Sequence, residues 1–124
     1  MTLTRGDTGF YKFQRLDVNG DPITSIPNSL YFTVKKSFTT NGFLFQKKLS
    51  DMTFGEDNYW HIIIEPEDTI NLKYGSYVFD IEVTTDNYVL TICKGQFVIT
   101  EESTWSENKC MTVLLRPKLL IPLV

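Results

Sequence analysis

The sequence predicts an all-β protein that folds as a sandwich of two antiparallel sheets. Alanine, the strongest helix former, is absent from the 124 residues, whereas the strand-favouring Val, Ile, Thr, Tyr, Phe and Trp fill 50 positions. Turn-forming residues interrupt the chain at short intervals, so the strands should be short. A chain of this length can bury one substantial core, and we expect one globular domain.

The first three strands follow from alternation and turn chemistry. Residues 9–16 alternate loosely between apolar and polar side chains and predict a strand, although Arg15 stands where an apolar residue is expected, which suggests a sheet edge. Residues 30–37 alternate more strictly. The Asn-Gly pair at 41–42 tolerates positive φ at both positions and predicts a hairpin that pairs 30–37 with 43–49.

The fourth strand is predicted over residues 59–64 and is followed by a short helical turn. The side chains expected to face the core are Trp60, Ile62 and Ile64. Pro66 ends the strand and suits the first position of a helix, and the acidic residues that follow it complement the helix dipole. We therefore expect one short helical turn near 66–72.

The last two strands form a second hairpin. Residues 77–84 alternate most cleanly, and residues 88–100 return after a tight turn. Within the returning strand, the apolar residues before and after Lys94-Gly95 lie in opposite phase. We expect a β-bulge near these two residues, because one extra residue restores the register.

Six to seven short strands in residues 1–101 favour an immunoglobulin-like sandwich. Within this topology Asp68, Gly75 and Tyr77 are expected to form a structural corner, in which Tyr77 returns its hydroxyl group to backbone upstream. Phe79 stands where immunoglobulin domains carry their second cysteine. Packing should therefore replace the disulfide.

Residues 102–124 consist of a polar linker and an apolar C-terminal tail. The tail is too apolar to remain in water as a free terminus, so it should pack either on its own domain or on a neighbouring subunit. The second arrangement would make the chain part of an assembly, including a homo-oligomer. The candidate contact residues are Trp105, Leu114, Leu115, Leu119, Leu120, Ile121 and Leu123.

The residue types predict no catalytic residues, no cofactor and no metal site, and we expect a protein that is not an enzyme. The only histidine, His61, alternates with apolar strand positions and is interpreted as structural. Cys93 and Cys110 are too few for a disulfide framework and are expected to be free thiols. The net charge of -3 argues against nucleic-acid binding, and the short, interrupted apolar tail argues against membrane insertion.

Two functions remain open from the residues alone. The first is an assembly module that acts through protein–protein contacts. The second is an adhesion or carbohydrate-binding module, which needs exposed aromatic rings, and its candidates are Trp105, Tyr59 and Tyr74. The N-terminus lacks the apolar core of a signal peptide, which predicts synthesis in the cytoplasm.

A series of short motifs resembles a known family. The motifs are Arg5-Gly6-Asp7-Thr8, Asp17-Val18-Asn19-Gly20-Asp21-Pro22-Ile23, Phe32-Thr33-Val34-Lys35-Lys36, Pro66-Glu67-Asp68-Thr69, Gly75-Ser76-Tyr77-Val78-Phe79-Asp80-Ile81 and Gly95-Gln96-Phe97-Val98-Ile99-Thr100. Over about residues 4–101 the chain resembles the immunoglobulin-like N-terminal domain of bacteriophage upper baseplate and related tail proteins. The resemblance implies a virion protein that docks other protein subunits onto a phage or prophage tail. It implies no catalytic residue.

Overall fold

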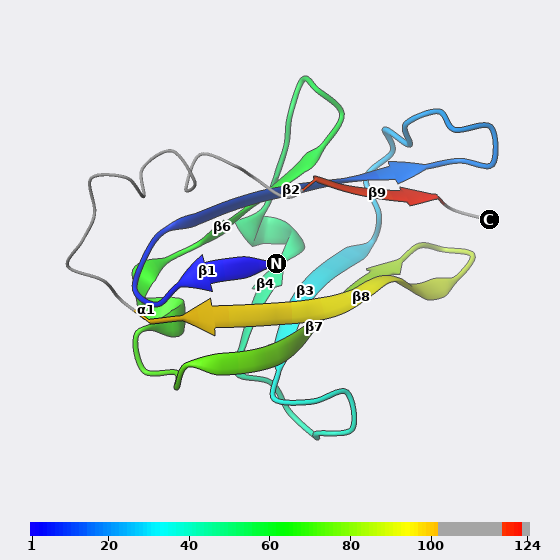
Figure 1. Ribbon diagram of the computed structural model, residues 1–124. Coiled ribbons are helices and arrows are strands. Elements are labelled where there is room, and N and C mark those ends of the chain that lie inside the picture. Colours follow the sequence, from blue (N-terminus) through cyan, green and yellow to red (C-terminus); the bar gives the residue numbers. More distant parts are fainter. Residues whose placement is uncertain (102–117, 123–124) are drawn as a thin grey trace.

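The computed structural model describes residues 1–101 and 118–122 and contains two β-sheets that face each other across one core (Figure 1). The prediction of an all-β protein is confirmed, because one short α-helix and one 3₁₀ turn are the only helical elements in these residues. Neither helical element has the length and apolar character needed to cross a membrane.

The strands are β1 (Thr2–Thr4), β2 (Gly9–Leu16), β3 (Ser29–Lys35), β4 (Phe45–Lys48), β5 (Thr53–Phe54), β6 (Trp60–Ile64), β7 (Gly75–Thr84), β8 (Val89–Thr100) and β9 (Lys118–Pro122). The 3₁₀ turn η1 (Leu49–Asp51) follows β4, and helix α1 (Pro66–Thr69) connects β6 to β7. One sheet has five strands in the order β1-β8-β7-β3-β4. The other has four strands in the order β5-β6-β2-β9.

Both sheets are mixed, so the prediction of two antiparallel sheets is wrong at two edges. β1 pairs with β8 in parallel, and β9 pairs with β2 in parallel, whereas the remaining strand pairs are antiparallel. Parallel partners cannot be joined by a hairpin and come from distant parts of the chain. Local alternation carries no signal for such pairings, which is why β1 and β9 were not predicted as strands.

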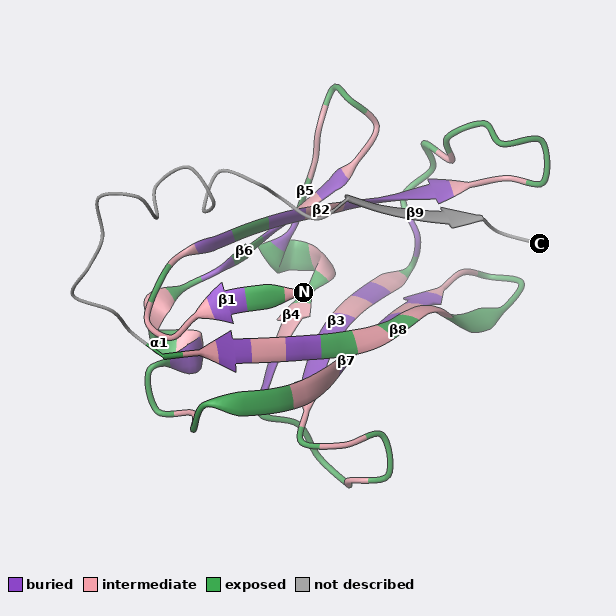
Figure 2. Ribbon diagram, in the orientation of Figure 1, coloured by how far each residue is buried: buried purple, intermediate pink, exposed green. Residues whose placement is uncertain are grey.

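The core lies between the two sheets and is built from the inward-facing residues of both (Figure 2). The rings of Phe32 and Phe79 lie 5.5 Å apart, and those of Phe45 and Phe97 meet edge to face at 6.0 Å. These ring contacts join β3, β4, β7 and β8. The residues that were predicted to face the core from β6, which are Trp60, Ile62 and Ile64, are buried.

Because Gly95 has no side chain, the ring of Phe79 can occupy the adjoining space in this core. The two residues are register partners across β7 and β8. A Cβ atom at position 95 would lie 2.6 Å from Cε1 of the Phe79 ring, which is closer than real Cβ contacts allow. The missing side chain therefore lets the ring lie against the β8 backbone, and Phe79 is buried.

The irregularity in the second hairpin lies slightly before the predicted position. Ile81 pairs with Cys93 and Glu82 pairs with Thr91, so Ile92 is the extra residue on β8. The predicted bulge near Lys94-Gly95 is therefore confirmed, with its extra residue two positions before Lys94. The alternation of apolar residues requires a change of phase within β8, but it does not identify which residue is the extra one.

The hairpin between β3 and β4 forms as predicted, but its connection is longer than a two-residue turn. Val34 and Phe45 are the last register pair, so residues 36–44 form a loop. Gly42 has a φ of 85°, whereas Asn41 does not have positive φ. The two-residue hairpin turn needs positive φ at both positions, and the prediction of that turn is wrong.

Arg15 does not mark a sheet edge. β2 lies between β6 and β9, and Arg15 is only 2% exposed. Its Nη2 atom donates a hydrogen bond of 2.7 Å to the backbone carbonyl of Ser25, in the loop after β2. Burial lowers the pKa of the guanidinium group, although nearby Tyr88 acts in the opposite direction. A long side chain that reaches a loop carbonyl thus replaces the apolar residue that the alternation favours.

Helix α1 lies within the predicted helical turn and begins at Pro66. Asp68 Oδ2 accepts a hydrogen bond of 2.7 Å from the backbone N–H of Glu65 and lies 2.6 Å from Nζ of Lys47 on β4. Asp68 therefore both caps the helix and ties it to the edge of the five-stranded sheet.

The connection from α1 into β7 ends in a tyrosine contact. Gly75, with a φ of 143°, begins β7, and the hydroxyl of Tyr77 donates a hydrogen bond of 2.7 Å to the backbone carbonyl of Lys73. This geometry fixes the angle at which the chain enters β7.

We expect Tyr77→Phe to reduce the free energy of unfolding by about 0.5–1.5 kcal/mol, the usual contribution of one hydrogen bond. Urea denaturation measures the change. The matched control is Tyr31→Phe, because no residue in the described part of the chain hydrogen-bonds to the Tyr31 hydroxyl. Equal destabilisation by the two substitutions would contradict a specific role for the Tyr77 hydroxyl.

Candidate functional site

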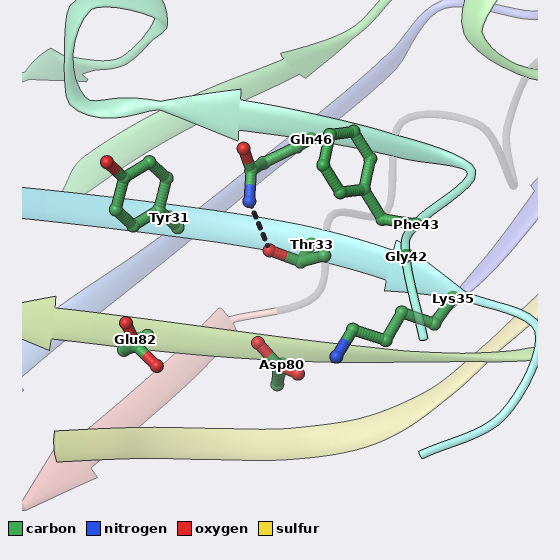
Figure 3. Close-up of a pocket in the computed structure, with 8 residues that line it drawn as sticks. All are labelled: Tyr31, Thr33, Lys35, Gly42, Phe43, Gln46, Asp80 and Glu82. Atoms are coloured by element: carbon green, nitrogen blue, oxygen red, sulfur yellow. Dashed lines mark hydrogen bonds between the residues drawn. The ribbon is translucent and has the colours of Figure 1, made fainter. Parts of the chain in front are cut away.

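A hollow of about 310 Å³ lies on the outer face of the five-stranded sheet, where β3, β4 and β7 run side by side (Figure 3). Its lining residues are Tyr31, Thr33, Lys35, Gly42, Phe43, Gln46, Asp80 and Glu82. Most of them come from strands rather than loops, so their backbone positions are fixed by the sheet.

The strand register arranges these side chains in rows. Thr33 is the register partner of Gln46 on β4 and of Asp80 on β7, and Tyr31 is the register partner of Glu82. Register partners on neighbouring strands point to the same face of a sheet. The hollow therefore has a polar floor that three adjacent strands build together.

Several polar groups in the hollow have no partner among residues 1–101 and 118–122. Nε2 of Gln46 donates a hydrogen bond of 3.1 Å to Oγ1 of Thr33, which orients the amide. In contrast, no residue in the described part of the chain hydrogen-bonds or ion-pairs with the side chains of Tyr31, Asp80 or Glu82. Both carboxylates are only partly exposed. Convergent polar groups that are half-buried and unpaired are typical of ligand sites.

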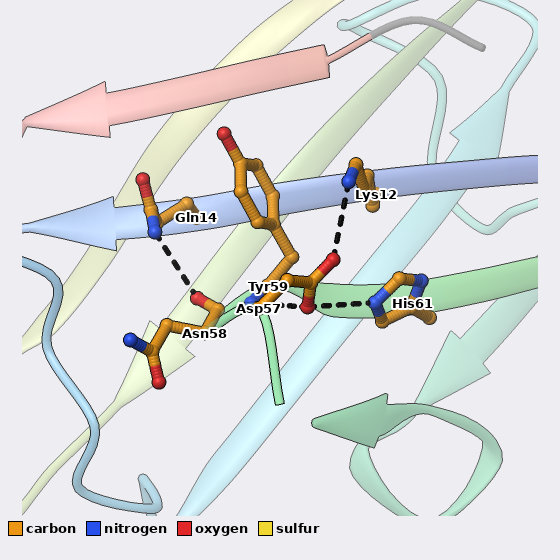
Figure 4. A network of polar contacts seen from close by, with 6 residues as sticks. All are labelled: Lys12, Gln14, Asp57, Asn58, Tyr59 and His61. Atoms are coloured by element: carbon orange, nitrogen blue, oxygen red, sulfur yellow. Dashed lines mark hydrogen bonds and ion pairs between the residues drawn. The ribbon is translucent and has the colours of Figure 1, made fainter. Parts of the chain in front are cut away.

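The outer face of the four-stranded sheet carries polar groups that are already paired with one another (Figure 4). Oδ1 of Asp57 lies 3.0 Å from Nε2 of His61, and Oδ2 lies 3.1 Å from Nζ of Lys12. Nζ of Lys12 also lies 4.3 Å from the centre of the Tyr59 ring. His61, interpreted from the sequence as a packed structural residue, thus lies on the outer surface and takes part in an ion-pair network.

This network fixes the turn between β5 and β6. A Cβ atom at Gly55 would lie 2.6 Å from Oδ1 of Asp57 and 2.7 Å from Nε2 of His61, so the close approach requires glycine. Asn58 adopts a φ of 63°, and Asp57 also accepts a hydrogen bond from the backbone N–H of Tyr59. The hydrogen bond from His61 is the main reason that the pKa of the Asp57 carboxyl lies well below its usual range.

Two of the three aromatic candidates for a ligand platform, Tyr59 and Tyr74, have contacts with basic side chains. The Tyr59 ring is covered by Lys12. Tyr74 is 44% exposed, but the guanidinium of Arg5 lies 4.3 Å from its ring centre and donates a hydrogen bond of 2.8 Å to its hydroxyl. Trp105 lies outside the described residues. Tyr59 and Tyr74 thus each lie against a different basic side chain.

The predicted contact residues of the tail fall partly in β9. Leu119, Leu120 and Ile121 are the register partners of Phe13, Gln14 and Arg15 on β2. The remaining candidates, which are Trp105, Leu114, Leu115 and Leu123, lie outside the described residues. The tail segment thus supplies a strand that completes the four-stranded sheet.

The hollow on the five-stranded sheet was not predicted from the sequence. Its signal was present, because Tyr31, Thr33 and Lys35 alternate with core residues of β3, and Asp80 and Glu82 alternate with core residues of β7. However, only the pairing of β3 with β7 brings the two outward rows together.

No group of three or more His, Cys, Asp or Glu side chains that could hold a metal ion occurs in residues 1–101 and 118–122. Cys93 is a free, partly buried thiol on β8, and burial raises its pKa. Cys110 lies outside the described residues.

Comparisons with known proteins give no family for this chain. No protein-family model matches it, and a search of curated proteins finds no match. The function must therefore be inferred from the arrangement of its residues.

The Asp57 network predicts a pH effect with a defined sign. Because the folded-state pKa of Asp57 lies below its unfolded value of about 3.9, its carboxylate stabilises the fold above that pH. This stabilisation is lost as the pH falls through the folded-state pKa. We expect His61→Gln to raise the pKa of Asp57 more than Lys12→Gln, as followed by carbon NMR of the carboxyl group.

The control for this titration is Lys94→Gln, which removes a lysine of the other sheet. It should leave the titration of Asp57 unchanged. A titration of Asp57 that is the same in His61→Gln as in the unmodified protein would show that the ring does not control the carboxyl group.

Proposed function

We propose that this chain is a non-enzymatic structural module of a phage or prophage tail or baseplate, and that it acts through contacts with protein subunits of that assembly. The observation that carries the proposal is the pairing of β2 with β9, a strand that the C-terminal segment supplies. The protein would be made in the host cytoplasm and become part of the virion.

The pairing of β2 with β9 is a type of contact that can link subunits. β9 is the edge strand of its sheet and pairs with β2 from Lys12 opposite Lys118 to Leu16 opposite Pro122. Strand addition at a sheet edge uses main-chain hydrogen bonds, whichever chain supplies the added strand. The pairing drawn within one chain in Figure 1 is therefore also available to a neighbouring chain.

The connection between β8 and β9 is long enough for such an exchange. Residues 102–117 separate Glu101 from β9, and a connection of this length can span up to about 55 Å when extended. That reach exceeds the length of a five-residue strand about threefold. We propose that neighbouring copies exchange β9 and thereby form a homo-oligomer, as in domain swapping.

The strand order supports an immunoglobulin-like arrangement as part of this proposal. In such folds one sheet has strands G, F, C and C′ in order, and the other has D, E, B and A. The orders β8-β7-β3-β4 and β5-β6-β2 follow the same sequence of strands, and β9 takes the place of strand A beside β2. The hydrogen bond from the Tyr77 hydroxyl to upstream backbone adds the tyrosine corner of these folds.

The assignment to a tail or baseplate is supported by the motif resemblance. We expect the reading frames beside this gene to encode tail or baseplate components, which genome sequence checks directly. A neighbourhood of unrelated metabolic genes would count against the assignment.

Removing residues 102–124 should convert an oligomer into a monomer, because the exchanged strand is lost. Size-exclusion chromatography with light scattering measures both masses. A full-length chain that is already monomeric at high micromolar concentration would overturn the exchange of β9.

Disulfide trapping tests the exchange independently of folding in the truncated chain. In a background with Cys93→Ser and Cys110→Ser, one chain carries Lys12→Cys and a second chain carries Lys118→Cys. These positions are register partners, and neighbouring strands lie within disulfide range at about 4.8 Å. A disulfide between the mixed chains can form only across subunits.

The control for trapping pairs Lys118→Cys with Lys94→Cys, since Lys94 lies on the other sheet. This pair should give no heterodimer. If the control forms a disulfide as readily as the Lys12 pair, the trapping reports random collision and not strand pairing.

A further inference from the structure

The hollow on the outer face of the five-stranded sheet has the composition of a small-ligand site (Figure 3). We propose that it binds a neutral saccharide, of the size of one or two sugar rings, as part of a glycan. The proposal is independent of the β9 pairing, because β9 belongs to the other sheet.

The hydrogen-bond acceptors of the hollow are two carboxylates on one strand. Asp80 and Glu82 are two positions apart on β7, so both side chains lie on its outward face. Each is partly exposed, and neither has a hydrogen-bond or ion-pair partner among the described residues. Ionised carboxylates accept several hydrogen bonds each, and the vicinal hydroxyls of a sugar supply matching donors.

The donors come from the neighbouring strand. Lys35 and Tyr31 on β3 contribute an ammonium and a hydroxyl group to the same lining. Between them Thr33 holds the amide of Gln46 by the 3.1 Å hydrogen bond. A saccharide hydroxyl is both donor and acceptor, so it can use a surface on which acceptors and donors lie in adjacent rows.

Two aromatic rings flank this polar floor. Figure 3 shows Tyr31 and Phe43 on opposite sides of the hydrogen bond between Gln46 and Thr33. Phe43 is 56% exposed and lies in the loop before β4. The electron-rich face of an aromatic ring attracts the polarised C–H groups of a sugar face. The exposed ring of Phe43 and the partly exposed ring of Tyr31, beside carboxylates that have no partner among the described residues, therefore suit a ligand with both C–H faces and hydroxyl edges.

Charge and size narrow the ligand class. Asp80 and Glu82 outnumber Lys35, which disfavours an anionic ligand, and the ammonium of Lys35 offsets one of the two negative charges, which weakens the attraction of a cation. A neutral ligand with many hydroxyl groups is compatible with both. The volume of about 310 Å³ lies at the small end of ligand pockets, which favours a mono- or disaccharide unit.

The polar residues of the hollow lie on three neighbouring strands. β3 is the middle strand and is paired in register with β4 on one side and with β7 on the other. In contrast, the polar groups on the other sheet are used by the Lys12–Asp57–His61 network. Among the described residues, the outer face of the five-stranded sheet therefore has polar side chains that are available to a ligand, whereas those of the Lys12–Asp57–His61 network are already paired.

Saturation-transfer NMR with the full chain tests the proposal. The probes are the methyl glycosides of glucose, galactose, mannose and N-acetylglucosamine, together with maltose and lactose. Putrescine and inorganic phosphate serve as cationic and anionic comparators. We expect transfer to at least one saccharide, with amide shift changes confined to β3, β4 and β7.

Substitutions then locate the binding. Glu82→Gln and Phe43→Ala should each weaken saccharide binding about tenfold, because each removes one contact from an otherwise intact sheet surface. The matched control, His61→Gln, alters the other sheet and should leave binding unchanged. Amide spectra of each variant establish that the fold is retained.

Three outcomes would overturn the proposal. They are the absence of transfer to every saccharide, binding of putrescine or phosphate alone, and saccharide binding that His61→Gln weakens as much as Glu82→Gln does. A monomeric chain that still binds saccharide through the hollow would reject the exchange of β9 and leave this site standing, so failures of the two proposals can be told apart.

Discussion

Backbone hydrogen bonding along β2 is the constraint on which the smaller sheet depends. β2 carries Tyr11 and Phe13 into the core, and its peptide N–H and C=O groups point within the sheet, where neighbouring strands satisfy them. β6 pairs with one edge of β2, and β9 pairs with the other. Because unpaired peptide groups at the edge of a buried strand are costly, a segment distant in the sequence pairs with this edge of β2. The function proposed for the C-terminal segment follows from that need.

The parts of the fold that could be predicted are those coded by neighbouring residues. Alternation predicted β2 at its observed bounds, and the proline and acids after β6 predicted α1, because each signal lies within a few residues of its effect. The parallel edges could not be predicted, since they depend on which distant segments meet. The prediction that Arg15 marks a sheet edge was wrong for the same reason. Its guanidinium group donates to the backbone carbonyl of Ser25, which lies in a loop whose path no local pattern specifies.

The candidate site shows the same division. Outward-facing side chains on β3 and β7 are visible in the alternation of each strand, but the hollow exists only because Thr33 and Asp80 are register partners. Conversely, Tyr59 and Tyr74 had suitable chemistry, yet Lys12 and Arg5 lie over their rings. Composition indicates which groups a surface offers, whereas pairing between strands decides which of them remain available to a ligand.

The contact between Gly95 and Phe79 has a consequence for how this sequence can change over evolution. The ring fills the space that a side chain at position 95 would need, so the two positions share one fixed volume. A larger side chain at position 95 requires a smaller one at position 79. A single replacement at either position therefore lowers the stability of the fold until the other position changes as well. Distant relatives would therefore be recognised by an inverse relation of size at these two sites, even where neither residue is retained.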